Sequence, residues 1–401
     1  MSEEPKYFFM IEKPLIDREK IITGVPRPKK FFARYREPRT HLPNMVSSQI
    51  NSFKWLIKEG IAEVFKEYSM IKDYSGKKFD LEFTDFKLAE PKYDEYYAKD
   101  NKLSYEGSLK ATIKLKNKML NVEKEQEIFL SELPMMTDHG TFIISGIERV
   151  IVPQLARSFG VFFTEQELRG KTYFGGKIIP ARGVWIEIDT ESDGAIYVRI
   201  DRKRKFAATS LLRVLGATSD EAIRALFKGV TQAEPYIENT LAKDHAKNVD
   251  ESFLEIHKRL RDGDMGTVEN AKEFIGNLFS PERYDISKVG RFRFNRRFNK
   301  VLTGKDSERR TINLDDVATI ISHIMSLNSE TGAIADDIDH LGSRRVRYVG
   351  ELLQQKLRVG MTQIKRNVQD RMSTVEPDIT QPLQFVSPKP LQARIKELKG
   401  L

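Results

Sequence analysis

The hydrophobic period of this sequence changes along the chain, between the 3.6-residue period of helices and the 2-residue period of strands. Residues 44–68 carry apolar side chains at helical spacing, which predicts an amphipathic helix. Residues 79–130 alternate apolar and polar positions, as half-buried antiparallel strands do. After residue 207 the helical period returns, and it continues through residues 233–280. This succession of periods predicts an α+β protein. The apolar stripe of the first helix consists of Met45, Ile50, Phe53, Ile57, Ile61, Val64 and Phe65.

Turn signals divide the middle of the chain into shorter elements. Residues 141–163 are a buried apolar stretch with glycine turn markers, which predicts two short strands and a turn. The DG pair at residues 193–194 separates two alternating runs and predicts a hairpin. Gly216 separates two predicted helices, and Thr218 or Ser219 caps the second of them.

The two ends of the sequence differ in character. Residues 1–43 mix prolines with basic residues and predict an arm that packs on something larger. A composition change near residue 335 predicts a return to an earlier domain, and residues 343–372 predict a long helix. The apolar stripe of that helix consists of Leu353, Leu357, Met361, Ile364, Val368 and Met372.

Charge and cysteine content restrict the class of protein. The 401 residues carry 67 Lys and Arg against 58 Asp and Glu, and this net charge of +9 favours polyanionic partners, nucleic acid ahead of membrane. The absence of cysteine excludes disulfides, Cys-type zinc sites and thiol nucleophiles. The sequence opens without a signal-peptide pattern, and no window approaches the roughly 18 apolar residues of a membrane span. We therefore expect a soluble, cytoplasmic protein.

The stretch DDIDHLGSRRVRYVG, residues 336–350, places acids and a histidine directly ahead of three arginines. If its start were helical, Asp336, Asp339 and His340 would share one face and could hold a divalent ion. The arginines oppose a metal site, because such a site needs negative potential. Two other interpretations stay open. One is a solvated loop whose acids favour the N-terminus of the next helix. The other is a mixed-sign nucleic-acid site, in which arginines hold phosphates or guanine while a carboxylate reads a base.

Two further clusters are basic. RIDRKRK, residues 199–205, ends a predicted strand. KVGRFRFNRRFNK, residues 288–300, interleaves arginines with phenylalanines. If this segment is extended, its phenylalanines face one way and several of its arginines the other. Such a strand would be either core with a solvated face or a surface that tracks a nucleic-acid backbone.

The sequence contains none of the common catalytic templates. Walker A, GxSxG and HExxH motifs are absent, and the six histidines are scattered. His139 and His340 are typical of turn or core histidines, and Asp315 and Asp316 are explained by capping at a predicted helix start. The residues therefore indicate a multi-domain nucleic-acid-binding protein without its own active site or metal. A metal-dependent nuclease using Asp336, Asp339 and His340 is the remaining catalytic alternative.

One long motif is more specific than these patterns. SELPMMTDHGTFIISGIERVIVPQLARSFGVFF, residues 131–163, strongly resembles the β subunit of bacterial DNA-directed RNA polymerase. The resemblance covers most of the chain, and the further matching stretches occur in the order found in the family. They are LPNMVSSQINSFKWLIKEG, KIIPARGVWIEID, VRIDRKRKFAATSLLRVLG, RYDISKVGRFRFNRR and DDIDHLGSRRVRYVGELLQQKLRVGMTQIKR.

The resemblance implies two mixed α+β domains, a discontinuous protrusion with the lobe inserted into it. The implied divisions are an N-terminal arm at 1–24, protrusion at 25–155 and 336–401, and lobe at 156–335. Together the domains would form one jaw of the DNA cleft and contact downstream DNA and the non-template strand during DNA-templated RNA synthesis. The alternative function is a free-standing nucleic-acid-binding or regulatory module derived from these domains.

The resemblance also implies site residues. A pocket for the non-template strand corresponds to Arg157, Trp185, Ile338, Asp339 and Arg344, in which Trp185 stacks on a base and Asp339 reads a guanine edge. We add three basic residues of the neighbouring runs as nucleic-acid contacts, namely Arg202, Lys203 and Arg347. Val152 matches a position at the border of the rifamycin-type antibiotic pocket.

The implied partners are the remainder of β, β′, the α dimer, a σ factor, DNA and RNA, in the cytoplasm at the nucleoid. Transcription-repair coupling factor would dock just before EQE, where this sequence departs from the family pattern at Glu123. No cofactor is implied in this chain, and the Mg²⁺ of the complete enzyme would be held by another subunit. A β subunit continues far beyond residue 401. We therefore expect a fragment or one piece of a split subunit, inactive alone.

Overall fold

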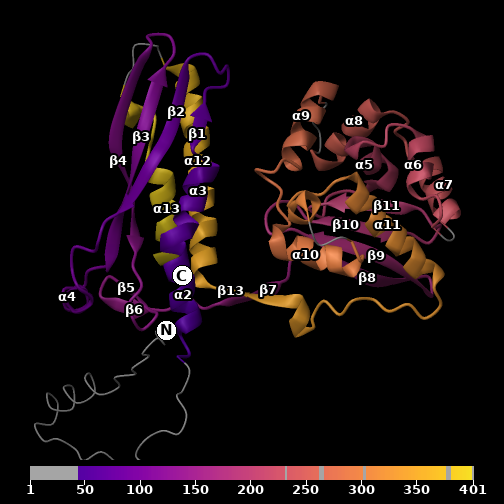
Figure 1. Cartoon of the computed structure of the whole chain (residues 1–401), viewed down its shortest axis with the longest axis horizontal. Helices are drawn as coiled ribbons and strands as arrows, with labels where there is room; N and C mark the ends of the chain where they lie inside the picture. The colour runs from indigo at the N-terminus through magenta and orange to yellow at the C-terminus, as the bar shows by residue number, and fades with distance from the viewer. Residues whose placement is uncertain (1–43, 231–232, 262–265, 301–303, 376–380, 400–401) are drawn as a thin grey trace, which may run out of the picture. The chain divides into compact units, whose positions relative to one another are not determined.

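The computed structural model describes residues 44–230, 233–261, 266–300, 304–375 and 381–399 (Figure 1). The arm predicted at residues 1–24, and the stretch from 25 to 43, lie outside these ranges. Helices and small antiparallel sheets are both present, so the predicted α+β class is confirmed. Within the described ranges, no helix is long and apolar enough to cross a membrane.

The first hydrophobic core is built from residues between 53 and 142 together with residues between 349 and 395. It contains a four-stranded antiparallel sheet in the order β1-β2-β3-β4, and Figure 1 shows helix α12 running along this sheet. The strands are β1 (Met70–Lys72), β2 (Phe79–Leu88), β3 (Glu106–Asn117) and β4 (Val122–Pro134). The alternation predicted for residues 79–130 is therefore confirmed. A short helix, α4 (Glu95–Asp100), capped by Asp94, lies in the connection between β2 and β3.

The first predicted helix contains a local irregularity that its apolar spacing did not reveal. It comprises α2 (Ser47–Trp55), a π-helical turn η1 (Leu56–Gly60) and α3 (Ile61–Glu67). A π turn contains more residues than an α turn, so it rotates the following side chains about the axis. Leu56, at the start of this turn, is fully buried, while Ile57 of the predicted stripe is only half-buried. Met45, also assigned to the stripe, lies before the helix begins.

The long C-terminal helix is α12 (Val349–Thr374), and it packs against α13 (Lys389–Lys399). All six residues of its predicted apolar stripe are buried in the first core. The predicted start at residue 343 is wrong, because residues 344–347 form a strand instead. Helix packing is close at Gly360, where a Cβ atom would lie 2.6 Å from a methyl carbon of Leu391.

The second hydrophobic core is built from residues between 163 and 327. Its five-stranded antiparallel sheet has the order β12-β11-β10-β9-β8, and helices pack around it. The strands are β8 (Gly160–Leu168), β9 (Lys171–Ile179), β10 (Ile186–Thr190), β11 (Ile196–Ile200) and β12 (Phe206–Ala207). The helices are α5 (Ala208–Leu215), α6 (Asp220–Leu226), α7 (Ala233–Lys243), α8 (Val249–Leu260), α9 (Val268–Leu278), α10 (Ser287–Arg297) and α11 (Leu314–Ser329). The exact domain bounds at residues 155 and 335 stay predictions.

Several turn predictions in this part of the chain are confirmed. The DG pair at residues 193–194 joins β10 to β11, and Gly194 has a φ of +80°. Gly216 ends α5 with a φ of +131°, and the Ser219 side chain caps α6 by accepting from Ala222 N. The 141–163 stretch contains two short strands, β5 (Phe142–Ile144) and β6 (Ile147–Arg149), but also β7 (Gln154–Arg157) and the start of β8. Its predicted burial is wrong in part, because Ile147, Val150 and Val152 are exposed.

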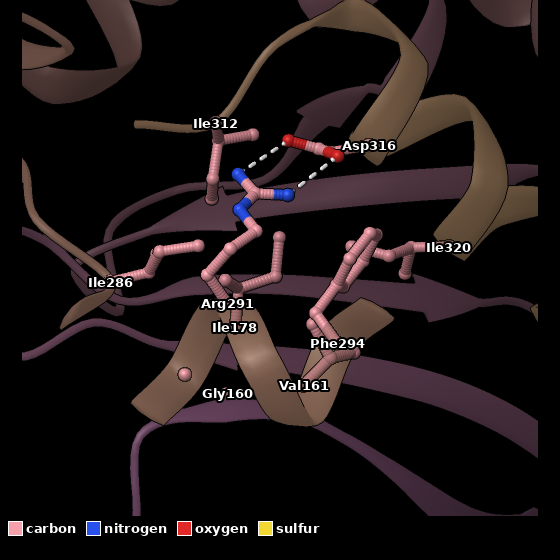
Figure 2. A pocket seen from close by; sticks show the side chains of 10 residues that line it. Gly160, Val161, Ile178, Ile286, Arg291, Phe294, Ile312, Asp316 and Ile320 are labelled. Carbon is pink, nitrogen blue, oxygen red and sulfur yellow. Dashed lines mark hydrogen bonds and ion pairs between the residues drawn. The ribbon is translucent and has the colours of Figure 1, made fainter. Parts of the chain in front are cut away.

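The segment 288–300 is not the extended strand considered above, because most of it forms helix α10. In a helix, residues 290, 291 and 294 fall on one face, and Gly290, Arg291 and Phe294 are buried there. Arg291 donates two hydrogen bonds of 2.9 Å to Asp316, as Figure 2 shows among the apolar side chains of a small pocket. The core, not a nucleic acid, therefore holds this arginine.

Asp316 lies in the first turn of α11, where the sequence predicted that the acids cap a helix. Asn313 caps α11 by accepting from Asp316 N, and Asp316 accepts in return from Asn313 N, a complete capping box. The same carboxylate binds Arg291 and Arg309. It is 2% exposed, so one residue completes the capping box and neutralises a buried arginine.

Candidate nucleic-acid interface

Two short strands at the crossings between the cores form the frame of the candidate site. The chain passes from the first core to the second near residue 157 and returns near residue 344. At these crossings β7 (Gln154–Arg157) pairs with β13 (Arg344–Arg347) in an antiparallel ribbon, visible in Figure 1. Arg157 lies directly opposite Arg344 in the register, although the two residues are 187 positions apart (344 minus 157).

The two faces of this ribbon have different surroundings. Directly paired residues share a face, so Arg157 and Arg344 lie on the same face as Leu155 and Val346. Arg345 and Arg347 alternate to the opposite face. There the Arg345 guanidinium lies 4.0 Å from the Phe159 ring centroid and pairs with Glu351, in the first turn of α12.

Arg347 pairs with the same carboxylate at 3.5 Å and donates to Gln355. The structure therefore does not bring Arg347 together with Arg344, although the sequence grouped them. The face with Arg157 and Arg344 is the more open one, because Leu155 and Val346 there are 53% and 42% exposed.

The loop ahead of β13 presents Asp339. Asp337 holds the loop by accepting from Asp339 N at 2.9 Å and His340 N at 3.1 Å. His340 Nδ1 accepts from Gly342 N at 3.0 Å, which fixes the turn into Arg344. The Asp339 carboxylate is 76% exposed and accepts a hydrogen bond of 2.6 Å from Arg344 Nη2. A carboxylate and a guanidinium are thus held side by side, in contact with solvent.

Trp185 joins the same group from the second core. It lies directly before β10, and its backbone carbonyl accepts from Asp201 N at 2.9 Å. Two guanidinium groups lie over its indole, that of Arg157 at 6.0 Å and that of Arg202 at 5.6 Å from the ring centroid. These distances fall within the range of cation–π attraction. The structure therefore gathers Arg157, Trp185, Arg202, Asp339 and Arg344 into one chain of contacts.

The other predicted site residues are close to members of this group in the sequence. Lys203 is exposed next to Arg202, and Ile338 is half-buried next to Asp339. Val152 is 72% exposed, ahead of β7.

The metal-binding arrangement of Asp336, Asp339 and His340 does not form, because residues 336–340 are not helical. Asp336 accepts from Phe163 N at 2.8 Å, and its own N–H donates to Phe163 O at 2.9 Å. The same carboxylate pairs with Arg297. No cluster of three or more His, Asp or Glu residues suited to a metal ion occurs in the described part of the chain.

The ribbon itself is the feature that sequence reasoning missed. A β-branched residue between arginines, as in RRVR, is compatible with a short exposed strand. Four residues are too few to separate a strand from the first turn of the helix that follows. Without the ribbon, the position of Arg344 opposite Arg157 could not be derived from the residues alone.

Comparison with known proteins shows which proteins this chain resembles. The family RNA polymerase Rpb2, domain 2, matches residues 158–347. The DNA-directed RNA polymerase subunit beta of Chloroflexus aggregans is 39% identical, with 93% of this chain and 33% of that protein covered. The corresponding subunit of Syntrophomonas wolfei is 38% identical, with 92% and 33% covered, and that of Synechococcus elongatus is 39% identical, with 90% and 32% covered.

The chain thus spans about a third of the length of the curated relatives that it matches. Over nine-tenths of its own residues align with them, and the match to the Rpb2 domain includes Trp185, Asp339, Arg344 and the whole second core. Over about nine-tenths of its length, the chain is therefore similar to one part of bacterial DNA-directed RNA polymerase β subunits.

Proposed function

We propose that the open face of the β7–β13 ribbon, with Trp185, contacts nucleic acid during DNA-templated RNA synthesis. One observation supports this proposal most strongly: residues distant in sequence converge on an exposed surface that combines an indole, guanidinium groups and a carboxylate. This combination suits recognition rather than bond making. An indole stacks on a base, guanidinium groups bind phosphate or guanine, and a carboxylate accepts from N–H groups of a base.

Asp339 is the residue that would read the base in this proposal. Guanine carries N–H donors on its Watson–Crick edge, and an exposed carboxylate accepts from them. In the free protein Asp339 accepts from Arg344 instead. A bound guanine would share or replace that contact, while Arg344 and Arg157 remain available for phosphate.

We further propose that the chain works within a larger assembly. It would form one jaw of the DNA cleft, facing downstream DNA and the non-template strand. Its partners would be the remainder of β, β′, the α dimer and a σ factor, with Mg²⁺ held by another subunit. The chain alone would be inactive in nucleotidyl transfer.

Two finer assignments belong to the same proposal. Val152 would border the rifamycin-type antibiotic pocket. Transcription-repair coupling factor would meet strand β4, where Glu123 pairs with Lys114 at 2.7 Å and Lys116 at 3.0 Å.

The test is binding of forked DNA with a guanine at the exposed single-stranded position, compared with the same fork bearing adenine. We expect Asp339→Ala to remove the preference for guanine and Arg344→Ala to weaken binding to both forks. Measurement at two salt concentrations separates these effects, because loss of a phosphate contact lowers the salt dependence.

Arg347→Ala is the matched control, because Arg347 lies on the same strand but on the opposite face. Equal losses for Arg344→Ala and Arg347→Ala would contradict the proposed face. Unchanged guanine preference in Asp339→Ala would contradict base reading by this residue and leave a general basic surface as the binding site.

A further inference from the structure

The turn after β11 has an unusual backbone for its sequence. Asp201 and Arg202 have φ angles of +51° and +57°, and Lys203 N donates to Ile200 O at 3.0 Å. Two consecutive residues at positive φ are the pattern of a type I′ turn, in which Asn-Gly or Asp-Gly is strongly preferred. Glycine would occupy the second position without steric cost, whereas arginine there is strained. The presence of Arg202 therefore needs an explanation other than the turn itself.

Both the backbone and the side chain of this turn contact Trp185. Asp201 N donates to the Trp185 carbonyl at 2.9 Å, and the Arg202 guanidinium lies 5.6 Å from the indole centroid. The turn conformation sets the direction in which the Arg202 side chain leaves the backbone. A planar guanidinium over an aromatic ring is attracted to the ring and limits the rotation of the aromatic side chain.

We propose that Arg202 is a positioning residue of this site: its left-handed turn conformation holds the guanidinium over Trp185 and fixes the indole for stacking by a nucleobase. This inference rests on the proposed nucleic-acid contact for its ligand class, but the positioning itself is a property of the free protein. When a base stacks on the uncovered part of the indole, the Arg202 guanidinium keeps its contact with the ring, and its charge also attracts the phosphates of the bound strand. Arg202 therefore acts on the base through Trp185 rather than by reading it.

The same sheet supplies a matched control. Leu168 pairs with Lys171 across a two-residue turn, in which Arg169 and Gly170 have φ angles of +52° and +75°. Arg169 is exposed and, like Arg202, is an arginine at positive φ in a hairpin turn. Replacing either arginine by glycine removes a non-glycine residue from positive φ, at the first central position of its turn for Arg169 and at the second for Arg202. The two substitutions differ in that Arg202→Gly also removes a guanidinium from Trp185.

The experiment uses the 401-residue chain with Trp55→Phe, which leaves Trp185 as the sole tryptophan. Arg202→Gly, Arg202→Lys and Arg169→Gly are compared in this background for thermal unfolding and for acrylamide quenching of Trp185 without nucleic acid. Binding of the forked DNA is then followed by Trp185 emission at two salt concentrations. If Trp55→Phe does not fold, the same variants are compared in the parent chain, where the contribution of Trp55 is common to all.

We expect both glycine variants to raise the Tm slightly, by about 1–3 °C, because the strain is relieved. Only Arg202→Gly and Arg202→Lys should increase the quenching of Trp185. Loss of the cation–π contact should weaken DNA binding about 2- to 5-fold in Arg202→Gly. Arg202→Lys should keep the salt dependence of binding, whereas Arg202→Gly should lower its slope by about one.

Equal quenching of Trp185 in Arg202→Gly, Arg169→Gly and the background protein would overturn the positioning role, whatever the DNA binding. Increased quenching in Arg202→Gly with no DNA binding by the background protein would support the positioning role and count against the proposed function. Increased quenching and weaker DNA binding in Arg202→Gly but not in Arg169→Gly, with a gain in Tm in both, is the result that supports both the positioning role and the proposed function.

Discussion

Helix α10 and the β7–β13 ribbon are both arginine-rich, yet they use arginine in opposite ways. In α10, Arg291 is 1% exposed and its guanidinium is enclosed by Asp316 and by the backbone carbonyls of Arg309 and Thr311. In the ribbon, the Arg344 side chain is 34% exposed and its partner Asp339 is 76% exposed. Charge content does not distinguish the two regions. Burial does, and it decides whether an arginine stabilises the fold or remains available to a ligand.

The two regions should also differ in how much their ion pairs contribute to the free energy of unfolding. A buried pair is costly to break, because removing one partner leaves a desolvated charge uncompensated. An exposed pair gains little, because water and salt screen it. The following predictions test this contrast, from the largest expected effect to the smallest.

The largest effect is expected for Asp316→Ala. It leaves Arg291 buried without a carboxylate and also removes the capping box of α11, so the free energy of unfolding should fall by about 3–5 kcal/mol. Urea denaturation measures this loss. The double variant Arg291→Met/Asp316→Leu should recover much of it, since an apolar pair of similar volume needs no charge compensation. A double variant as unstable as Asp316→Ala would contradict the electrostatic explanation.

The second effect concerns the exposed region and appears in binding. Trp185→Ala should weaken binding of forked or single-stranded DNA by about 1–3 kcal/mol, because a stacking surface is lost. Titration of labelled DNA measures it. The same variant should lose far less unfolding free energy than Asp316→Ala. If instead Trp185→Ala unfolds the protein and leaves binding of the remaining folded fraction intact, Trp185 is a core residue.

A third, smaller effect is a pH dependence confined to the buried region. His323 of α11 lies 4.5 Å from the Phe163 ring centroid, and burial lowers its pKa, with Arg297 acting in the same direction and with Asp336 and Glu330 opposing. The unfolded chain therefore binds a proton more readily than the folded one. Stability from this group is complete above the ordinary histidine pKa of 6.5 and is lost as the pH falls toward the lowered folded value. His323→Phe should make the Tm depend less on pH between about pH 5 and pH 7, the range in which histidine titrates. An unchanged slope would exclude His323 as the source.

The smallest effect is expected for the exposed ion pair. Asp339→Ala and Arg344→Ala should each change the free energy of unfolding by no more than about 1 kcal/mol, and the change should shrink in high salt. Thermal unfolding at low and high salt measures it. A loss comparable with that of Asp316→Ala would remove the distinction between the two regions.

The sequence predicted those parts of the fold that local chemistry determines. The stripe from Leu353 to Met372, the hairpin turn ending at Gly194 and the Ser219 cap each follow from short-range patterns, and all three are present. For residues 288–300, the alternation of Arg and Phe in RFRF suggested an extended segment, which the structure does not contain. That run has period 2 over four residues only, whereas the burial of Gly290, Arg291 and Phe294 follows the helical period.

The candidate site was predictable only in part. Its residues followed from the resemblance, which carried the stretches around Arg157, Trp185 and Asp339. The contacts between these residues could not be predicted. The pairing of Arg344 with Arg157 depends on a strand register between two distant segments, which local sequence patterns cannot relate. The opposite orientation of Arg347 follows from the same register. The left-handed backbone at Arg202 contradicts the local preference of arginine, so no propensity argument could have found it.

The ribbon also sets an order on how this chain can fold. All residues of the second core lie in one continuous stretch, whereas the first core needs residues from both sides of that stretch. During synthesis the second core can fold once residue 327 has emerged, whereas β7 cannot pair until β13 has been synthesised. The contact between Arg157 and Arg344 has a sequence separation large enough to make it a late event. The candidate surface on the ribbon is therefore assembled only after the residues of the second core have emerged, and a growing chain that has not yet reached β13 cannot display it.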